Sequence, residues 1–406
     1  MFRTRSAGKG VRMSNLIEEF DKLLDDSGPA AILFRRRFRP VEGDDAWIFP
    51  PTFAQTESAD EDEEGGGGHY QIDPLPDDKR RNVCLIDSIG SQANRMEPIF
   101  KQEKYSFLVP QVTITLKDGE TVNLLDAGHR AADAVIRFSN AYGPKFWSAF
   151  TKYRDEQDCT DLLRLAPTSL LFGVWDSRAT GVKIQRIVRS VVRAYNVTEA
   201  KRSATYRAAY DYTGNDVINP ELDKGSGKKN PLSQEGFKYS LATGTHGGVL
   251  VKGDIQQEAV VNLVALRTLT NDVNAKRYLL GLALVSLSYR AQEGFNLREG
   301  CLLCAASKED YAGTWKVVQF DGTDDAEVFK GFSHDAAVEF ATEAAKNISL
   351  EKPVPDEFDR DTATKWLGID KKRRKVLAKT SHPSKAVVEE AKRAAKSKSK
   401  AEVPNA

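Results

Sequence analysis

The sequence predicts an α+β protein in which a sheet is covered by helices mainly on one face. Two observations support this class. Segments with strand-like and helix-like patterns alternate irregularly along the chain, and no internal repeat is evident. The chain is also long and apolar enough to bury a real core, because it has 406 residues, of which 40% are hydrophobic, and a mean hydropathy of −0.46.

Helices are expected where apolar residues recur every three or four positions. Leu16, Phe20 and Leu24 have this spacing near the N-terminus, and Ser14 is a possible N-cap for that helix. The segments expected to be helical are residues 15–25, 91–101, 129–139, 144–155, 181–195, 256–269 and 274–291.

Strands are expected where short apolar or β-branched runs are bounded by turn residues. The segments expected to be strands are residues 30–39, 82–86, 105–116, 169–175, 201–212, 301–306 and 314–320. An Asp118-Gly119 pair follows the third of these strands and is typical of a tight turn.

The chain is expected to contain one main domain with additions at both ends. Residues 1–29 should form an N-terminal helical segment, residues 30–360 the main domain, and residues 361–406 a basic tail that is helical in part and otherwise disordered. Residues from about 225 to 253 end in a glycine-rich stretch and predict a projecting arm or hairpin.

Charge is distributed in blocks, so the formal net charge of +1 is a cancellation. Residues 41–78 hold 12 acidic side chains and no Lys or Arg, which predicts a solvated, acidic and glycine-rich loop at residues 55–70. Residues 361–406 hold 13 basic and 5 acidic side chains, and we expect the run Lys371 to Lys375 to attract DNA non-specifically.

Several classes of protein are excluded by what the sequence lacks. The longest uncharged apolar stretch, residues 278–289, is too short for the roughly 20 residues that span a bilayer. No apolar segment of a secretory signal follows the N-terminus, so a cytoplasmic location is expected. Cys301 and Cys304 form a lone CxxC without a second ligand pair, so we expect no metal and no cofactor.

The segment 85–97, LIDSIGSQANRME, leaves an expected strand and enters an expected helix. Ser91, Gln92, Asn94 and Arg95 would place hydrogen-bond donors beside free backbone N–H groups, which suits a phosphate. The alternative is an ordinary Asp or Ser N-cap with a polar first turn. The spacing of a P-loop is absent.

His129 and Arg130 open another expected helix, with Asp133 one turn later. A capping or buried His–Asp pair is the simpler interpretation. A catalytic set of Ser91, His129 and either Asp126 or Asp133 is also conceivable. That interpretation is disfavoured because the chain has no G-x-S-x-G nucleophile elbow.

Residues 178–207 hold eight basic side chains and a single acid, Glu199. Arg186, Arg189 and Arg193 would share one face of an amphipathic helix over 181–195. A solvated helix face is the ordinary explanation. A track for a phosphate backbone is the functional one, and Arg178 begins it.

The run Arg35-Arg36-Arg37-Phe38-Arg39 places a basic cluster with an aromatic inside an expected strand. Alternate residues of a strand share a face, so Arg35, Arg37 and Arg39 should point the same way. Exposed Arg and aromatic residues on a sheet are used to hold single-stranded RNA. The alternative is an edge strand that is protected from aggregation by its charges.

Three motifs of this chain, in this order and rough spacing, resemble a CRISPR backbone subunit of the Cas-seven group, type I-G (formerly I-U). They are the segment 85–97, the segment 129–134 (HRAADA) and the segment 169–178 (SLLFGVWDSR). The resemblance covers about residues 30–330 and leaves out the acidic loop and the basic tail.

The resemblance implies an RRM-like (ferredoxin-like) palm with inserted finger and thumb elements. It also implies a non-enzymatic subunit of a type I Cascade complex that polymerises along the crRNA and presents the guide to target DNA. The implied partners are the crRNA, copies of the same chain, a large subunit, the subunit that binds the 5′ end of the guide, and target DNA through guide pairing. The arm at residues 225–253 would be the thumb.

A guide of arbitrary sequence must be held through its backbone, because its base edges have to remain available for pairing. The residues expected to contact RNA are Ser91, Gln92, Asn94, Arg95, His129, Arg130 and Arg178, with Arg35, Arg37, Arg186 and Arg189 as further candidates. Two alternatives remain: a guide-directed ribonuclease of the type III kind using Asp87 or Asp126, and a generic single-strand-binding protein.

Overall fold

The computed structural model describes residues 13–53, 68–76, 78–225, 230–238, 240–289 and 295–401. Most of the predicted acidic, glycine-rich loop therefore lies outside the described residues. Within them, the chain combines a large antiparallel sheet with many helices, so the α+β class is confirmed.

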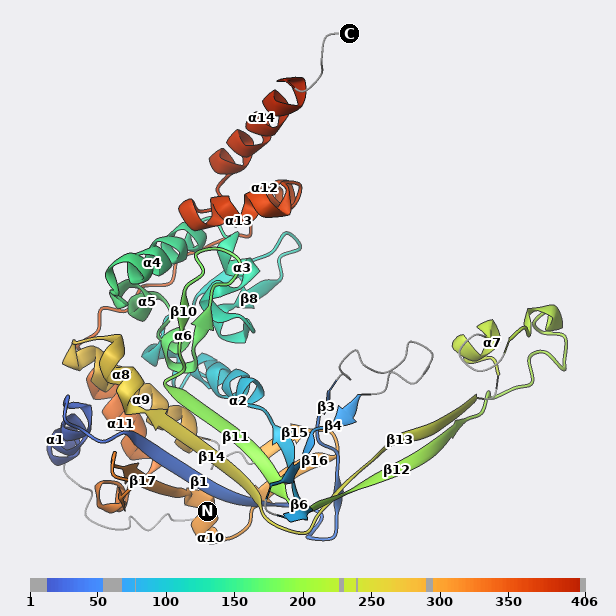
Figure 1. Ribbon diagram of the computed structural model, residues 1–406, viewed down its shortest axis with the longest axis horizontal. Coiled ribbons are helices and arrows are strands. Elements are labelled where there is room, and N and C mark those ends of the chain that lie inside the picture. The colour runs from blue at the N-terminus through green and yellow to red at the C-terminus, as the bar shows by residue number, and fades with distance from the viewer. Residues whose placement is uncertain are drawn as a thin grey trace.

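The centre of the molecule is a nine-stranded antiparallel sheet with the order β15-β16-β1-β14-β11-β6-β5, in which β17 also pairs with β1 and β18 with β17 (Figure 1). Its strands are β1 (Ala31–Pro40), β5 (Ile72–Leu75), β6 (Asp78–Asp87), β11 (Val188–Tyr195), β14 (Ile255–Asn262), β15 (Phe295–Arg298), β16 (Cys301–Ala305), β17 (Thr314–Val318) and β18 (Asp324–Asp325). β1 lies inside the sheet, because β14 pairs with one of its edges and β16 and β17 share the other.

The two faces of this sheet differ in burial. On β1, Phe34, Arg36 and Phe38 are buried, while Arg35 and Arg37 are exposed. β14 repeats the alternation along its whole length. We call the covered side the inner face and the other side the outer face.

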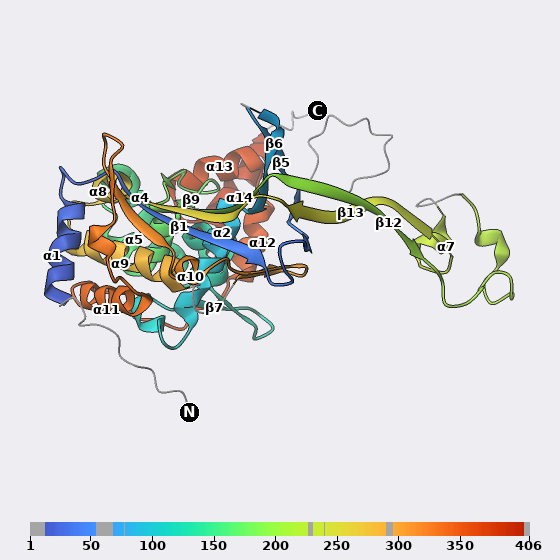
Figure 2. The same cartoon turned by 90° about the horizontal axis from the view of Figure 1, so that it is seen from below.

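Helices cover the inner face. α1 (Met13–Leu24), α2 (Ile89–Met96), α8 (Leu263–Leu269), α9 (Val273–Tyr289) and α11 (His334–Ala345) all contribute to the main core. α9 is apolar around its circumference and is buried almost throughout, and α11 packs along it. Figure 2 shows α9 and α11 together on one side of β1 and β14.

A second group of short elements lies between α2 and the start of β11 and contacts the C-terminal region through the bridges Thr115–Glu357 and Ser139–Phe358. They are β7 (Thr113–Thr115), β8 (Thr121–Asn123), α3 (Ala134–Arg137), α4 (Tyr142–Glu156), α5 (Thr160–Leu165), α6 (Pro167–Phe172), β9 (Val174–Trp175) and β10 (Lys183–Ile184). Short 3-10 helices connect them at Glu97–Lys101, Ser106–Leu108, Leu124–Asp126 and Arg130–Ala132.

A long hairpin projects from the sheet, formed by β12 (Val197–Tyr206) and β13 (Ser240–Val251), with α7 (Pro231–Gln234) near its tip (Figure 1). At its base β13 also pairs with β2 (Trp47–Ile48). The arm anticipated at residues 225–253 contains α7 and the returning strand β13, whereas the outgoing strand β12 begins at Val197. Two further short strands, β3 (Thr52–Phe53) and β4 (His69–Tyr70), pair with each other.

The C-terminal segment forms three helices, α12 (Arg360–Leu367), α13 (Lys371–Thr380) and α14 (Lys385–Ala401). Trp366, Ala378 and Val388 are buried in a small core together with Phe138. The expected helical part of the tail thus comprises three helices within residues 360–401.

Four segments have a different conformation from the one the sequence pattern suggests. Residues 181–195 form β10 and β11 instead of a helix, and residues 255–262 form β14 before α8 begins. Residues 167–172 form α6 instead of a strand, and 105–116 contain a 3-10 turn and the short β7. Within the described chain, no helix is long and apolar enough to cross a membrane.

Candidate functional site

The three sequence motifs meet at the side chain of Arg130. Arg130 has a left-handed backbone (φ 53°) and only 5% of it is exposed. Its Nε donates to Glu97 Oε2 at 2.7 Å, one terminal nitrogen donates to Asn94 Oδ1 at 3.1 Å, and the other donates to the Gly173 carbonyl at 3.3 Å. One guanidinium thus joins the segments 85–97, 129–134 and 169–178.

A second set of contacts closes the same junction. The Ala131 N–H donates to Ser169 Oγ at 3.2 Å, and the Arg130 guanidinium lies 5.7 Å from the centre of the Phe172 ring. Gly173 has φ +80°, and a Cβ there would lie 2.6 Å from Arg186 Cγ. Because an L side chain is strained in that conformation and would also collide, this position requires glycine.

Glu97 is the buried anion of the junction, and 1% of it is exposed. Burial raises its pKa to about 7, although the Arg130 guanidinium opposes the shift. The ionised form of this carboxyl depends on Arg130 for its stability, because a buried charge without a partner carries a large desolvation penalty.

A buried polar network lies beside this junction. Asp87 is fully buried and accepts hydrogen bonds from Gln92 Nε2 at 2.5 Å and Arg95 Nε at 3.1 Å. Gln92 Oε1 in turn accepts from Ser190 Oγ at 3.0 Å and Gln257 Nε2 at 3.2 Å. These bonds fix α2 against β11 and β14.

The structure thus divides the residues that we expected to contact RNA. Gln92 and Arg130 are buried and hydrogen-bonded within the protein, so these two predictions do not fit the observed surface. Arg95 is one quarter exposed and is oriented by Asp87. Asn94 is exposed, but its Oδ1 accepts from Arg130. Buried positioning residues and surface residues share one motif and cannot be separated by sequence reasoning alone.

Ser91 lies in the first turn of α2 and is half-buried. Its N–H donates to Ser88 Oγ at 3.2 Å, so Ser88 is the N-cap of the helix. The alternative interpretation of this segment, an ordinary serine cap, is therefore confirmed. The cap therefore occupies the Ser91 N–H group, one of the backbone donors that the sequence pattern suggests for a phosphate.

Three residues of the motifs and of the segment that follows them are exposed. His129 and Arg178 are exposed. Arg186 is also exposed at its tip, while its Nε donates to the Phe172 carbonyl at 2.9 Å. Partial burial and the nearby Arg130 lower the pKa of Arg186.

The outer face of the sheet holds a second group of cations. Arg35, Arg37 and Arg39 are exposed on the same side of β1, which confirms the predicted alternation. Arg35 lies 3.2 Å from Glu258, and Arg37 lies 3.2 Å from Asp310. Because β1 is an internal strand, the interpretation as a protected edge strand is wrong.

β11 contributes further cations to the outer face. Arg189 and Arg193 lie opposite Val260 and Gln256 of β14, while Arg35 of β1 lies opposite Glu258. Arg193 approaches Glu258 at 3.6 Å, so this carboxylate is shared by Arg35 and Arg193. Arg189 forms no ion pair with any described residue. The predicted helical stripe is wrong, but its arginines still share a face, now as alternate residues of a strand.

Residues 32–199 match the family model of CRISPR-associated protein GSU0053 (Cas_GSU0053). This part of the chain, less than half of its length, is thus similar to a family of CRISPR-associated proteins. The matched region begins in β1, includes all three motifs and ends in β12. The search of curated proteins returned no match.

Two aromatic residues of the chain were missed as candidates. Tyr195 shares the outer face with Arg189 and Arg193, whereas the expected aromatic, Phe38, is buried. Trp175 is 60% exposed, with Lys183 Nζ 5.5 Å from its ring centre. Trp175 lies inside the motif 169–178, and this position is the sequence signal that could have identified it as a candidate.

The catalytic set considered for Ser91 and His129 is not assembled. No hydrogen bond joins these two side chains in the described structure, and Asp133 instead caps α3 by accepting from the Val135 N–H at 3.1 Å. Of the two aspartates considered for a ribonuclease, Asp87 is fully buried, and Asp126 is ion-paired with Lys101 at 2.6 Å.

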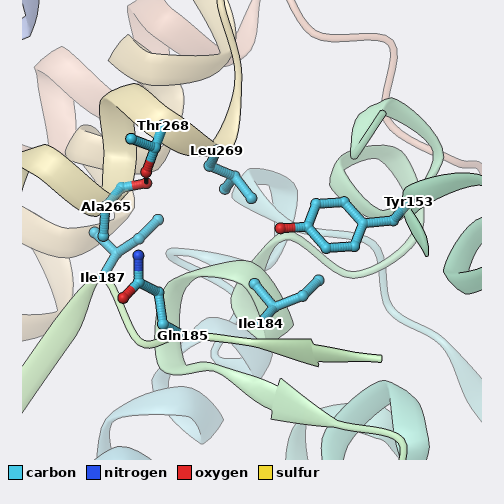
Figure 3. A pocket seen from close by; sticks show the side chains of 7 residues that line it. All are labelled: Tyr153, Ile184, Gln185, Ile187, Ala265, Thr268 and Leu269. Atoms are coloured by element: carbon cyan, nitrogen blue, oxygen red, sulfur yellow. Dashed lines mark hydrogen bonds between the residues drawn. The ribbon is translucent and has the colours of Figure 1, made fainter. Parts of the chain in front are cut away.

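The cysteines and the small cavity near this site do not suggest chemistry either. Burial raises the pKa of Cys84 to about 12 and that of Cys301 to about 11, so both thiols stay protonated. A cavity of about 40 Å³ lies beside Gln185, and Figure 3 shows the Gln185 amide and the Tyr153 hydroxyl directed toward it. This volume holds a few water molecules and is too small for a nucleotide.

Proposed function

We propose that this protein is a non-catalytic guide-RNA-binding backbone subunit of the Cas-seven type, in a type I CRISPR interference complex of the I-G subtype. Copies of the chain would polymerise along the crRNA and present its bases for pairing with target DNA. The further partners would be a large subunit and the subunit that binds the 5′ end of the guide. The family match supports the CRISPR role, and the surface chemistry supports the binding of RNA.

The observation that carries the proposal is the outer face of the sheet. Five arginines from two strands that flank β14 lie on it, together with Tyr195, and all six are exposed or partly exposed; the arginines are Arg35, Arg37, Arg39, Arg189 and Arg193. Arg37 is paired there with Asp310 of the short helix α10 (Lys308–Ala312). Guanidinium groups bind phosphate in a geometry that suits two hydrogen bonds. A fixed array of them can hold an RNA backbone of any sequence, as a guide requires.

The connections of the sheet support an RRM-like palm. Strands β11, β14, β1 and β17 lie side by side, all antiparallel, and α8 and α9 connect β14 to the strands that follow. If β1, β11, β14 and β17 are numbered 1 to 4 in chain order, their order across the sheet, read from β17 to β11, is 4-1-3-2. This is the strand order of a βαββαβ unit. The segment between β1 and β11 would then be the main insertion.

The β12–β13 hairpin supports a thumb-like role. It extends away from the sheet (Figure 2) and carries the exposed cations Lys201 and Arg202 on β12. Near its tip Tyr212 packs edge-on against Tyr210 and Phe237, with ring centres 5.7 and 5.1 Å apart. Such an arm could reach a neighbouring copy or the guide beyond its own palm.

The test is co-expression of the chain with a CRISPR array and the other proteins of the complex. We expect the purified assembly to contain RNA of uniform length and many copies of this chain. The variant with Arg35→Ala and Arg189→Ala should recover less RNA, while Lys346→Ala, which removes one partner of a solvated ion pair with Glu343, should not. Monomeric protein free of RNA would contradict the proposal.

A cleavage assay tests the non-catalytic part separately. The assembly is incubated with complementary RNA and Mg²⁺, and we expect the RNA to stay intact. Cuts at regular spacing would show a guide-directed ribonuclease instead. Equal binding of repeat-derived and unrelated RNA would favour the generic single-strand-binding protein.

A further inference from the structure

Helix α13 concentrates positive charge without a balancing acid. Ten residues contain six cations and no acidic side chain; the cations are Lys371, Lys372, Arg373, Arg374, Lys375 and Lys379. None of the six forms an ion pair with any residue that the structure describes. The one described ion pair between the C-terminal helices joins Lys365 to Glu389 at 4.0 Å.

This arrangement of cations destabilises α13. Four of the cations occupy the first turn, at the positive end of the helix dipole, where acidic side chains are favoured. Lys371, Lys375 and Lys379 are also spaced at i, i+4 and i+8, so like charges are neighbours on one face. The N-cap Asp370 is the only acid that offsets them, by accepting from the N–H groups of Lys372 and Arg373.

The body of the protein nevertheless holds α13 firmly in place. Trp147 Nε1 donates to the Ala378 carbonyl at 3.1 Å, and Arg154 donates to the Lys379 carbonyl at 3.0 Å. Ala378 is 1% exposed and Val388 of α14 is fully buried. The apolar side of α13 is thus docked, while Lys371, Lys372, Lys375 and Lys379 are exposed.

We propose that the exposed cations of α13 form a docking surface for the phosphate backbone of duplex DNA. An external polyanion would relieve the repulsion that remains, because none of the six cations is ion-paired with a described residue. Lys371, Lys375 and Lys379 lie along the helix at intervals of about 6 Å, set by a rise of about 1.5 Å per residue. They therefore offer a straight and regular row of charges.

Two further observations favour a duplex over a single strand. Sites for single strands combine cations with aromatic rings on which bases stack, whereas α13 and α14 contain no Phe, Tyr or Trp. The C-terminal helices also lie beyond α3 and α4, away from the sheet strands β1 and β14 (Figure 1). A guide lying on the outer face of the sheet would leave this surface free.

The test compares two variants of the full chain that lose the same number of charges. One combines Lys371→Ala, Lys372→Ala, Lys375→Ala and Lys379→Ala. The control combines Lys152→Ala, Lys316→Ala, Lys330→Ala and Lys346→Ala, four lysines that each face an acidic partner. Affinity for a 30-base-pair duplex of unrelated sequence is measured by fluorescence anisotropy over a series of KCl concentrations.

We expect the α13 variant to bind the duplex at least tenfold more weakly at about 0.1 M salt, with a clearly shallower dependence of log K on log salt, because each lost phosphate contact removes about 0.9 from that slope. The control should keep the affinity and the slope of the unmodified chain. Equal affinity and slope in the α13 variant would overturn the proposal.

Three other results would also overturn the proposal of a duplex site. If the α13 variant loses affinity for single-stranded RNA but keeps the duplex, or if polyglutamate competes as well as duplex DNA at equal charge, the surface is not a duplex site. A change of oligomeric state without nucleic acid would identify a protein partner and would also overturn the proposal. A second variant with the same four positions changed to Gln, together with circular dichroism, separates these effects from loss of the helix.

Discussion

Positive charge has two different roles at the Arg130 junction and on the outer face of the sheet. Arg130 is buried and uses its guanidinium within the protein, on Glu97, Asn94 and the Gly173 carbonyl. Arg35 on the outer face is half-exposed and has one partner, Glu258, which it shares with Arg193. The first arginine fixes the geometry of the fold, whereas the second can exchange its partner for a phosphate.

This contrast separates effects on folding from effects on binding. Removing a member of the buried junction should destabilise the protein before it affects RNA. Removing an arginine of the outer face should weaken RNA binding without unfolding the chain, because exposed ion pairs contribute little to stability. Each of the following variants tests one side of this contrast.

The largest effect is expected for Arg130→Ala. This change leaves the Glu97 carboxyl buried without its partner, which should lower the free energy of unfolding by about 3–5 kcal/mol. Urea unfolding followed by circular dichroism measures it. Replacing both partners, with Arg130→Met and Glu97→Leu, should be less destabilising than Arg130→Ala. An Arg130→Ala protein as stable as the unmodified chain would show that the junction is not structural.

The next effect is a dependence of stability on pH that arises from Glu97. Burial raises its pKa in the folded state to about 7, above its ordinary value of 4.5. The folded state therefore binds the proton more tightly, so this contribution is fully present below about pH 4.5 and is lost as pH rises through about 7. The loss should amount to about 3 kcal/mol, since one pKa unit is worth about 1.36 kcal/mol.

Glu97→Gln is the matched variant for this pH effect. It removes the titrating carboxyl and leaves the other ionisable groups in place, including His334, whose pKa burial lowers. Between pH 5 and pH 8 the unmodified chain should lose more stability than Glu97→Gln does. Parallel curves for the two proteins would contradict the prediction.

A smaller effect is expected on the outer face of the sheet. Arg35→Ala and Arg189→Ala should each weaken binding of single-stranded RNA by up to about tenfold, which is about 1.4 kcal/mol. Each should also reduce the slope of log K against log salt by about 0.7, the value for one phosphate contact on a single strand. Urea unfolding of both variants should match that of the unmodified chain, and a large loss of stability would show that the two roles are not separate.

The smallest effect, and one of opposite sign, is expected for Glu258→Gln. Glu258 lies 3.2 Å from Arg35 and 3.6 Å from Arg193, so it competes with any phosphate for both guanidinium groups. Removing its charge should strengthen RNA binding a few-fold, by less than about 1 kcal/mol. Gln256 lies on the same strand and face without such ion pairs, so Gln256→Ala is a suitable control. Weaker binding by Glu258→Gln would mean that these ion pairs orient the arginines for RNA.

Part of the candidate site could be predicted because it depends on local spacing. The exposure of Arg35, Arg37 and Arg39 follows from the two-residue period of a strand, and the helix α9 follows from its long apolar run. The conformation of β11 could not be predicted in this way. Arg189 and Arg193, four residues apart, share a face in both a helix and a strand, and its β-branched valines were the only local sign of a strand.

The burial of Gln92 and Arg130 was equally out of reach. Both belong to polar motifs at the start of expected helices, where a side chain open to solvent is the usual outcome. What buries them are partners far along the chain: Ser190 and Gln257 for Gln92, and Gly173 for Arg130. Sequence reasoning found the right segments but could not tell which residues hold the site together and which ones face a ligand.

The sequence by itself determined the fold class, the helices and strands with a clear local period, the blocks of charge and the coincidence of three motifs. Tertiary structure decided that 181–195 and 255–262 are strands, because β14 lies between β1 and β11 and pairs residues as distant as Ala31 and Asn262. It also decided which arginines are buried. The physical reason is that short apolar runs and isolated cations are ambiguous locally, and only burial against a distant partner removes the ambiguity.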